Sequence, residues 1–252
     1  LSDDRWNKKT LIMKKTVAII GSSGAIGNAV SNNLLNDDSV EIIYKFSRSK
    51  SIDENPKVKN IFLDIEDEES VKSSVEQIPS NIKFDLVFVA TGILHNDKEI
   101  FPEKSIKDIN IEKLKKVILV NTIGPTLVGK YFIPFLKKNE QSVFAFLSAR
   151  VGSISDNKLG GWYSYRASKT ALNQIIKNFS IEVNRTNKNA IFVGLQPGTV
   201  KSFLSKPFER NVKADNLFTP EYSAEKMLQV INELTPNDSG KVFAWNGEEI
   251  QP

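Results

Sequence analysis

The sequence predicts an α/β fold in which helices cover both faces of one parallel sheet. Short apolar segments rich in Val, Ile and Phe occur at residues 17–20, 41–46, 60–63, 85–89, 143–147, 190–195 and 241–244. They are too short for helices and mostly lack polar alternation, as expected of strands buried on both faces. Longer segments with helical spacing lie between them, at 25–35, 66–77, 111–136, 164–183 and 220–234. This alternation predicts right-handed crossovers and a doubly wound sheet in a three-layer α/β/α arrangement.

Length and composition indicate a single globular domain. The chain has 252 residues, of which 40% are hydrophobic and 25% charged, and no Gly/Ser-rich linker or internal repeat divides it. We expect one domain over residues 14–252, preceded by a candidate disordered extension at 1–13. No apolar run approaches the roughly 18 residues that a membrane-spanning helix needs, so we expect no membrane partner.

The absence of cysteine and the single histidine exclude several kinds of site. Without cysteine there is no disulfide framework, thiolate metal site or cysteine nucleophile. His95 alone does not form a multi-histidine metal site. The net charge of +4 is modest and the basic residues are spread out, so we do not expect a nucleic-acid partner. The amino terminus does not resemble a secretory signal, and we expect a cytoplasmic protein.

A glycine-rich turn follows the first predicted strand. The segment Gly21-Ser-Ser-Gly24-Ala-Ile-Gly27 leads directly into a helical pattern. Such a turn lets the backbone approach a pyrophosphate, while the start of the helix offers free N–H groups. Glycines alone would indicate only a tight turn, but their place between strand and helix favours a Rossmann-type dinucleotide site.

The ends of the second and third predicted strands bear on cofactor choice. Arg48 follows the second strand, and no acidic residue stands beside it to bind a ribose 2′-hydroxyl. An arginine at this place accepts the 2′-phosphate of NADP, so we expect NADP(H) to be favoured over NAD(H); the alternative is an ordinary surface arginine. Asp64 and Ile65 follow the third strand, where the carboxylate would read an adenine amino group or else cap the next helix.

Tyr165 and Lys169 form a candidate catalytic pair. Their spacing of four residues places the phenol and the ammonium on one face of a predicted helix. A nearby ammonium lowers the pKa of a tyrosine, which would suit proton exchange. The spacing alone does not discriminate, because Tyr222 and Lys226 share it. That second pair has no catalytic companions nearby, and we interpret it as part of a surface helix.

The order of the motifs resembles the short-chain dehydrogenase/reductase family. The glycine loop is followed by VNTIG, LSARVGS, YRASK and QPGTV, and the likeness extends over nearly the whole chain from about Val17 onwards. The stretch LSARVGSISDNKLGGWYSYRASK is most similar to the C-factor-like and sniffer-like branch, which includes both reductases and signalling proteins.

The resemblance implies a role for each matching residue. Tyr165 would be the general acid/base, Lys169 would hold the nicotinamide ribose and tune the tyrosine, and Asn121 would support a water relay. It further implies a cofactor site built from Gly21, Ser23, Gly24, Ile26, Gly27, Arg48, Asp64, Ile65, Ala90, Thr91, Gly92, Asn121, Tyr165, Lys169, Pro197, Gly198 and Val200. Pro197 and Gly198 could instead form a plain turn, and Asn121 could merely satisfy backbone groups.

Three positions depart from the family pattern. Ala25 and Val89 replace residues that are often glycine and asparagine, and we expect both changes to be tolerated. The third concerns the serine that bonds the substrate carbonyl, because its position is occupied by Ala149. Ser148 and Ser153 are the alternatives; strand alternation turns Ser148 away from the face of residue 149 and so favours Ser153, unless the strand end is bulged.

These observations favour an NADPH-dependent reductase that interconverts a small-molecule carbonyl and its alcohol. A nucleotide-binding signalling or sensing protein is the alternative, because fold does not fix function. A nucleotide-sugar epimerase or dehydratase is disfavoured, since little chain is left to build a substrate domain. The segment at 202–218 contains Phe203, Leu204, Phe208 and Phe218, which would either line a lid or belong to the core. The apolar surface predicted for 111–136 and 164–183 suggests a homodimer or homotetramer.

Overall fold

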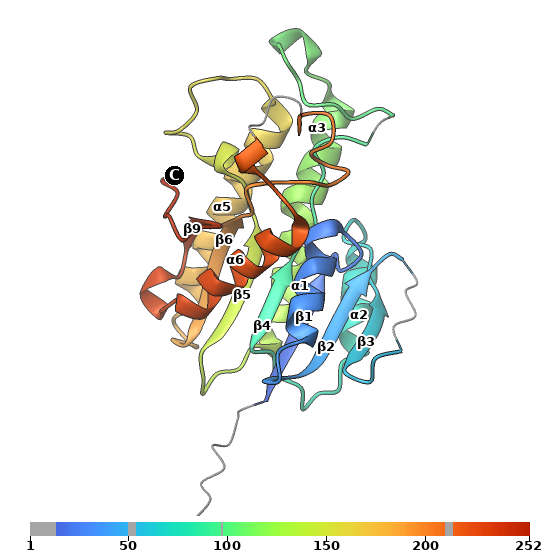
Figure 1. The fold of residues 1–252 in the computed structure, drawn as a ribbon, viewed down its shortest axis with the longest axis vertical. Helices are drawn as coiled ribbons and strands as arrows, with labels where there is room; N and C mark the ends of the chain where they lie inside the picture. The colour runs from blue at the N-terminus through green and yellow to red at the C-terminus, as the bar shows by residue number, and fades with distance from the viewer. Residues whose placement is uncertain (1–13, 50–53, 97, 210–213) are drawn as a thin grey trace, which may run out of the picture.

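A seven-stranded parallel sheet forms the centre of the protein, with strand order β3-β2-β1-β4-β5-β6-β9 (Figure 1). The computed structural model describes residues 14–49, 54–96, 98–209 and 214–252; the expected extension at 1–13 lies outside these ranges. The seven predicted strands are confirmed as β1 (Lys15–Ile20), β2 (Val40–Ser47), β3 (Val58–Phe62), β4 (Leu86–Val89), β5 (Ser142–Leu147), β6 (Ala190–Gln196) and β9 (Lys241–Ala244). The doubly wound fold class is therefore confirmed.

Helices cover both faces of the sheet. One apolar cluster joins a sheet face to α1 (Ala25–Leu35) and α6 (Pro220–Glu233), which lie side by side in Figure 1. A second cluster joins the opposite face to α2 (Glu68–Glu76), α4 (Gly124–Phe132) and α5 (Tyr163–Val183). Strand segments such as Leu86–Val89 are buried along their whole length, which explains why they show no polar alternation.

Shorter elements connect these layers. Strands β7 (Thr199–Val200) and β8 (Leu217–Phe218) pair with each other outside the main sheet, an element that the sequence did not predict. Single 3₁₀ turns occupy η1 (Ile106–Asp108), η3 (Ile133–Phe135), η4 (Arg150–Gly152), η6 (Ala214–Asn216) and η7 (Pro236–Asp238).

The single helix predicted at 111–136 is interrupted. It consists of α3 (Ile111–Ile118), a π-helical turn η2 (Leu119–Ile123), then α4 and η3. Pro125 lacks the N–H that would bond the carbonyl of Asn121 four residues earlier, so the regular α pattern does not continue through this point. The interruption lies where the family resemblance implies a functional asparagine.

Within the described residues, the helical run Ile111–Phe135 is long and apolar enough, by length and composition, to cross a membrane. This corrects the expectation that no apolar run reaches that length. Half of its most apolar stretch is buried inside the protein, and the core helix of a soluble protein meets the same criterion. A single such helix is weak evidence for a membrane segment.

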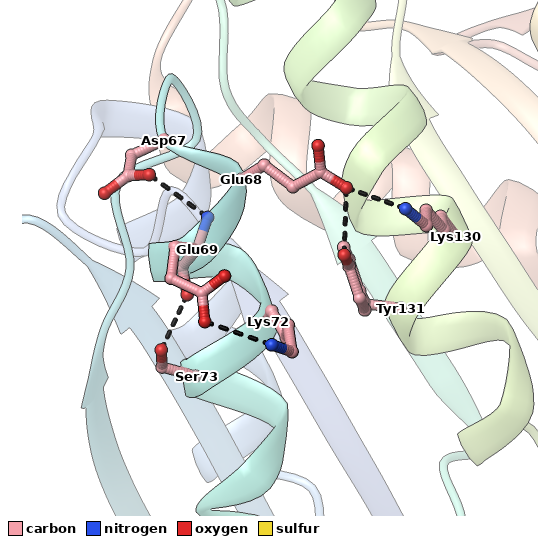
Figure 2. A network of polar contacts seen from close by, with 7 residues as sticks. All are labelled: Asp67, Glu68, Glu69, Lys72, Ser73, Lys130 and Tyr131. Carbon is pink, nitrogen blue, oxygen red and sulfur yellow. Dashed lines mark hydrogen bonds and ion pairs between the residues drawn. The ribbon is translucent and has the colours of Figure 1, made fainter.

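A network of polar side chains joins α2 to α4, two helices that cover the same face of the sheet (Figure 2). The carboxylate of Glu68 accepts hydrogen bonds from Lys130 Nζ at 2.7 Å and from the Tyr131 hydroxyl at 2.9 Å. These bonds lower the pKa of Glu68. Asp67 caps the first turn of α2 by accepting from the Glu69 amide at 3.1 Å, so the network fixes the start of that helix.

Large apolar side chains are exposed on the helices for which oligomer contacts were expected. Ile111, Ile123 and Ile181 are 63%, 45% and 51% exposed. The oligomeric state stays a prediction.

Candidate active site

A cavity of about 600 Å³ opens at the carboxyl ends of the strands. Its walls come from the start of α1 and from the segments that follow β4, β5 and β6, together with side chains of α5. This is the edge of the sheet where ligands bind in doubly wound folds. Far-apart parts of the sequence therefore converge on one hollow.

The glycine loop forms one end of the cavity. Gly21 has a left-handed backbone with φ of +81°, and a Cβ there would approach Thr91 Cγ2 to 2.8 Å. A Cβ on Gly27 would lie 2.3 Å from the carbonyl oxygen of Gly21, so helix and loop can meet this closely only at glycine. Gly24 is the N-cap residue of α1 and gives it no side-chain cap. The first turn of α1 thus offers free N–H groups of the kind that bind a pyrophosphate.

The candidate pair Tyr165 and Lys169 meets the glycine loop in this cavity. Both line it, and Lys169 Nζ lies 5.8 Å from the centre of the Tyr165 ring. The ammonium donates a 2.8 Å hydrogen bond to the carbonyl of Leu147 at the end of β5. Burial lowers the pKa of Lys169 to about 8 and raises the pKa of Tyr165 to about 12. The expected lowering of the tyrosine pKa by the ammonium is therefore not seen, because desolvation dominates.

Asn121 is fully buried in the π-helical turn. Its Oδ1 accepts from the Ile93 amide at 2.7 Å, while its Nδ2 donates to the Ile93 carbonyl and to Ser168 Oγ. A Cβ on Gly92 would be 3.5 Å from Asn121 Oδ1 and 3.6 Å from Lys169 Nζ. The amide thus fixes the chain after β4 by bonding backbone groups, as the alternative interpretation held, and its oxygen and the lysine nitrogen both lie near Gly92.

The two candidate serines occupy different surroundings. Ser148 lines the cavity, but its hydroxyl donates a 2.6 Å hydrogen bond to Asn173 Oδ1. Ser153 is buried outside the cavity lining; its Oγ accepts from the Asp156 amide at 3.1 Å and contacts Ser155 Oγ at 3.2 Å. Ala149 itself lines the cavity. Strand alternation favoured Ser153 as the serine of the site, but the structure does not bring Ser153 to the cavity.

Arg48, Asp64 and Ile65 were predicted to bind the adenosine part of the cofactor. None of the three belongs to the lining of the cavity. Arg48 pairs with Glu66, Nη1 to Oε1, at 3.5 Å. The residue that caps α2 is Asp67 and not Asp64. The Oδ1 atom of Asp64 instead accepts a hydrogen bond from the Glu66 amide at 3.1 Å. Ser23 is exposed on the glycine loop.

An aromatic wall, of which the sequence indicated only Phe203 and Phe208, lines the cavity near Tyr165. Trp162 lies with its ring centre 6.1 Å from that of Tyr165 and 5.1 Å from that of Phe208. His95 stacks on Phe203 at 4.9 Å, and the Phe203 carbonyl lies 2.8 Å from His95 Nε2. Leu204 also lines the cavity, as the lid hypothesis predicted. The fourth proposed lid residue, Phe218, instead packs on Trp245 at 4.6 Å.

Glu103 holds the start of α5 from a distant part of the chain. This side chain is only 4% exposed, and its carboxylate accepts hydrogen bonds from both the amide and the hydroxyl of Ser164. The Glu103 carbonyl accepts from the Trp162 amide at 2.6 Å. Among the described non-glycine residues only Trp162 has a positive φ, at 52°. The local sequence contained no signal for this clamp, because its two sides are 61 residues apart.

The cavity brings together eleven of the residues predicted for the site: Gly24, Ile26, Ala90, Thr91, Gly92, Ser148, Tyr165, Lys169, Pro197, Gly198 and Val200. Tyr222 and Lys226, with the same spacing as the candidate pair, lie on α6 and do not line it.

Comparison with known proteins finds a family match over most of the chain. The family model described as short chain dehydrogenase matches residues 15–213. A Rhodococcus protein named 1-hydroxy-2-glutathionyl-2-methyl-3-butene dehydrogenase is 30% identical over 75% of this chain and 78% of its own length. The C-signal protein of Myxococcus xanthus is 29% identical over 58% of this chain and 82% of its own.

Solved structures share the fold over most of the chain. NADPH-bound carbonyl reductase from chicken fatty liver superimposes with a TM-score of 0.83 at 23% identity, covering 95% of this chain and 100% of the other. Carbonyl reductase Sniffer of Drosophila melanogaster gives a TM-score of 0.81 at 19% identity with the same coverage.

Proposed function

Because this chain belongs to the short-chain dehydrogenase family, we propose that it is an NADPH-dependent reductase that converts a small-molecule carbonyl into an alcohol. The observation that carries the proposal is the placement of Tyr165 and Lys169 in the same cavity as the open first turn of α1. The glycine loop fits a dinucleotide, since its glycines let the turn pack closely on Thr91 and on the start of α1, whose first turn has no side-chain cap. The carbonyl reductases among its structural neighbours, one of them with NADPH bound, support the choice of reaction.

The residues divide the work between binding and proton transfer. NADPH, when bound, supplies the hydride. The start of α1 would hold the pyrophosphate, and Lys169 would hold the nicotinamide ribose. With a pKa of about 12, the Tyr165 phenol is protonated at neutral pH and would donate its proton to the carbonyl oxygen. Lys169 Nζ and Asn121 Oδ1 both lie near Gly92, where a water relay would return a proton to the tyrosine.

The aromatic wall would exclude water from this reaction. Trp162 packs against Tyr165, and Phe208 packs on Trp162, so the substrate carbonyl would meet the phenol in apolar surroundings. An electrostatic interaction is stronger there than in water. The wall therefore suits both hydride transfer and a short hydrogen bond to the carbonyl oxygen.

A sensing role without catalysis is the second candidate function, favoured by Ala149 and by the C-signal relative. The serine that would polarise the carbonyl is replaced by a side chain with no hydrogen-bonding group. A protein that only binds the nucleotide would tolerate this replacement fully.

Conversion of Tyr165 to Phe separates the two functions. We expect Tyr165→Phe to reduce the rate of NADPH-dependent carbonyl reduction by about 10²–10⁴ while the NADPH dissociation constant stays within about twofold. Tyr222→Phe is the matched control, since this tyrosine also precedes a lysine by four residues on a helix but lies outside the cavity. Reduction by Tyr165→Phe at the parent rate would refute the assigned proton donor. NADPH binding without reduction of any aldehyde, ketone or quinone would favour sensing.

A further inference from the structure

Glu66 connects two cations at the rim of the predicted adenosine site. Its Oε1 lies 3.5 Å from Arg48 Nη1, and its Oε2 pairs with Lys116 Nζ. The three side chains come from different elements: Arg48 follows β2, Glu66 follows β3, and Lys116 belongs to α3. One carboxylate thus joins the expected phosphate-binding arginine to a lysine more than 60 residues away.

The turn that carries Glu66 is held on several sides. Asp64 Oδ1 accepts from the Glu66 amide, and the Asp67 amide donates to the Asp64 carbonyl at 3.2 Å. On the side of α4, Gly124 packs so closely on Ile65 that a Cβ would approach the Ile65 carbonyl oxygen to 2.6 Å. The Glu66 backbone is therefore fixed in place beside the end of β2.

This network differs from the ion pair Glu112–Lys115 of α3 in the burial of its carboxylate. The Glu66 side chain is 18% exposed, while its partners Arg48 and Lys116 are 65% and 42% exposed; in the α3 pair, joined at 3.0 Å, the carboxylate and the ammonium are 74% and 63% exposed. A shielded carboxylate acts on its neighbours with less screening by water and salt than an exposed one. Glu66 therefore affects the charge available at Arg48 more strongly than a fully exposed carboxylate would.

From this arrangement we propose that Glu66 determines how strongly the protein prefers NADP(H) over NAD(H). It competes with the ribose 2′-phosphate for the Arg48 guanidinium, while Lys116 offsets part of its charge. The inference rests on the proposed function, since it takes Arg48 as the group that meets the 2′-phosphate. A phosphate oxygen bound by this guanidinium at about 2.8 Å would come close to the Glu66 carboxylate, and the two anions would repel.

The proposal assigns opposite effects to the two partners of Arg48. Removal of the Glu66 charge frees both cations for the phosphate. Removal of the Lys116 charge leaves Arg48 as the one remaining partner of this pair of cations for the Glu66 carboxylate, so Arg48 binds the phosphate less strongly. NADH has no 2′-phosphate, so neither change alters its binding by this route. The sign of each effect distinguishes competition for Arg48 from a purely structural role of the turn.

Direct titration of the purified protein with NADPH and NADH, followed by nicotinamide fluorescence, tests the proposal without any substrate. For Glu66→Gln we expect the NADPH dissociation constant to fall about threefold to fivefold while that for NADH changes less than twofold. For Lys116→Met we expect the NADPH constant to rise by a similar factor. Glu112→Gln, which removes an exposed carboxylate of α3, is the control and should change neither constant.

A double substitution tests whether the effect passes through Arg48. In an Arg48→Ala background, Glu66→Gln should no longer tighten NADPH binding, and in the parent its effect should shrink at 0.5 M salt. Unchanged NADPH binding in Glu66→Gln, weaker binding, or equal changes for both nucleotides would overturn the proposal. If the parent bound neither nucleotide, the proposed function would fail as well. If the parent bound NADPH and Arg48→Ala did not change the NADPH dissociation constant, the proposed cofactor site would be retained and only the inference about Glu66 would be refuted.

Discussion

The hydroxyl of Ser148 donates a 2.6 Å hydrogen bond to Asn173 Oδ1 on α5. The group is thus committed to joining the end of β5 to the helix that carries Tyr165. The side chain of its neighbour Ala149, which lines the cavity, has no hydrogen-bond donor. The carbonyl of a substrate would therefore depend on Tyr165 for its hydrogen bond.

Restoring a hydroxyl at position 149 should improve carbonyl reduction. We expect Ala149→Ser to raise kcat/KM about tenfold, less than the 10²–10³ that a positioned donor supplies in sites built around it. Ser148→Ala should lower kcat/KM less than about threefold and act mainly on stability, through the lost bond to Asn173. Steady-state kinetics with one aldehyde and NADPH would measure both. A hundredfold loss in Ser148→Ala would show that Ser148 leaves Asn173 and assists the reaction itself.

The buried ammonium of Lys169 should make stability depend on pH. Burial lowers its pKa from 10.5 to about 8, so between these values the unfolded chain binds a proton that the folded protein has lost. The free energy of unfolding should therefore rise as pH rises from about 8 to 10.5. Relative to Lys169→Met, the parent should gain up to about 3 kcal/mol over this interval.

Urea unfolding of the parent and of Lys169→Met at pH 7 and pH 10 measures this difference. Lys115→Met is the control, since it removes a lysine that is exposed on α3 instead of a buried one. A constant difference between the parent and Lys169→Met at the two pH values would contradict the prediction.

Loss of the Glu103 carboxylate should loosen the start of α5. In Glu103→Ala the buried amide and hydroxyl of Ser164 lose their acceptor, and the helix loses a negative charge at its first turn, so we expect a loss of about 2 kcal/mol in the free energy of unfolding. Because Tyr165 follows Ser164 directly, kcat should fall while the NADPH dissociation constant changes little. Glu103→Gln, which keeps one acceptor, should show smaller losses of both.

Glu99→Ala provides the comparison from the same loop, since Glu99 is exposed. It should leave both the unfolding midpoint and kcat unchanged. Equal stability of Glu103→Ala and the parent would mean that the clamp does not stabilise the helix start.

The boundaries of helices and strands along the chain were easier to predict than the positions of side chains in the site. Strand and helix boundaries follow local hydrophobic periodicity, so the seven strands could be predicted within a few residues. The interruption around Asn121 was missed, even though Pro125 was visible, because a proline can either kink a helix or begin a new one. The serine question could not be settled in this way, since strand alternation does not describe the 3₁₀ turn Arg150–Gly152 that follows β5.

The sequence alone determined the doubly wound sheet, the glycine loop at its first crossover and the pairing of Tyr165 with Lys169, because each depends on spacing within a few turns of chain. Tertiary structure alone decided which side chains meet across long separations. The clamp between Glu103 and Ser164, the Glu66 link from Arg48 to Lys116, and the wall formed by Trp162, His95 and Phe203 all join segments far apart in sequence. Even the pKa of Tyr165 belongs to this second group, since burial by the whole fold outweighs the charge four residues away.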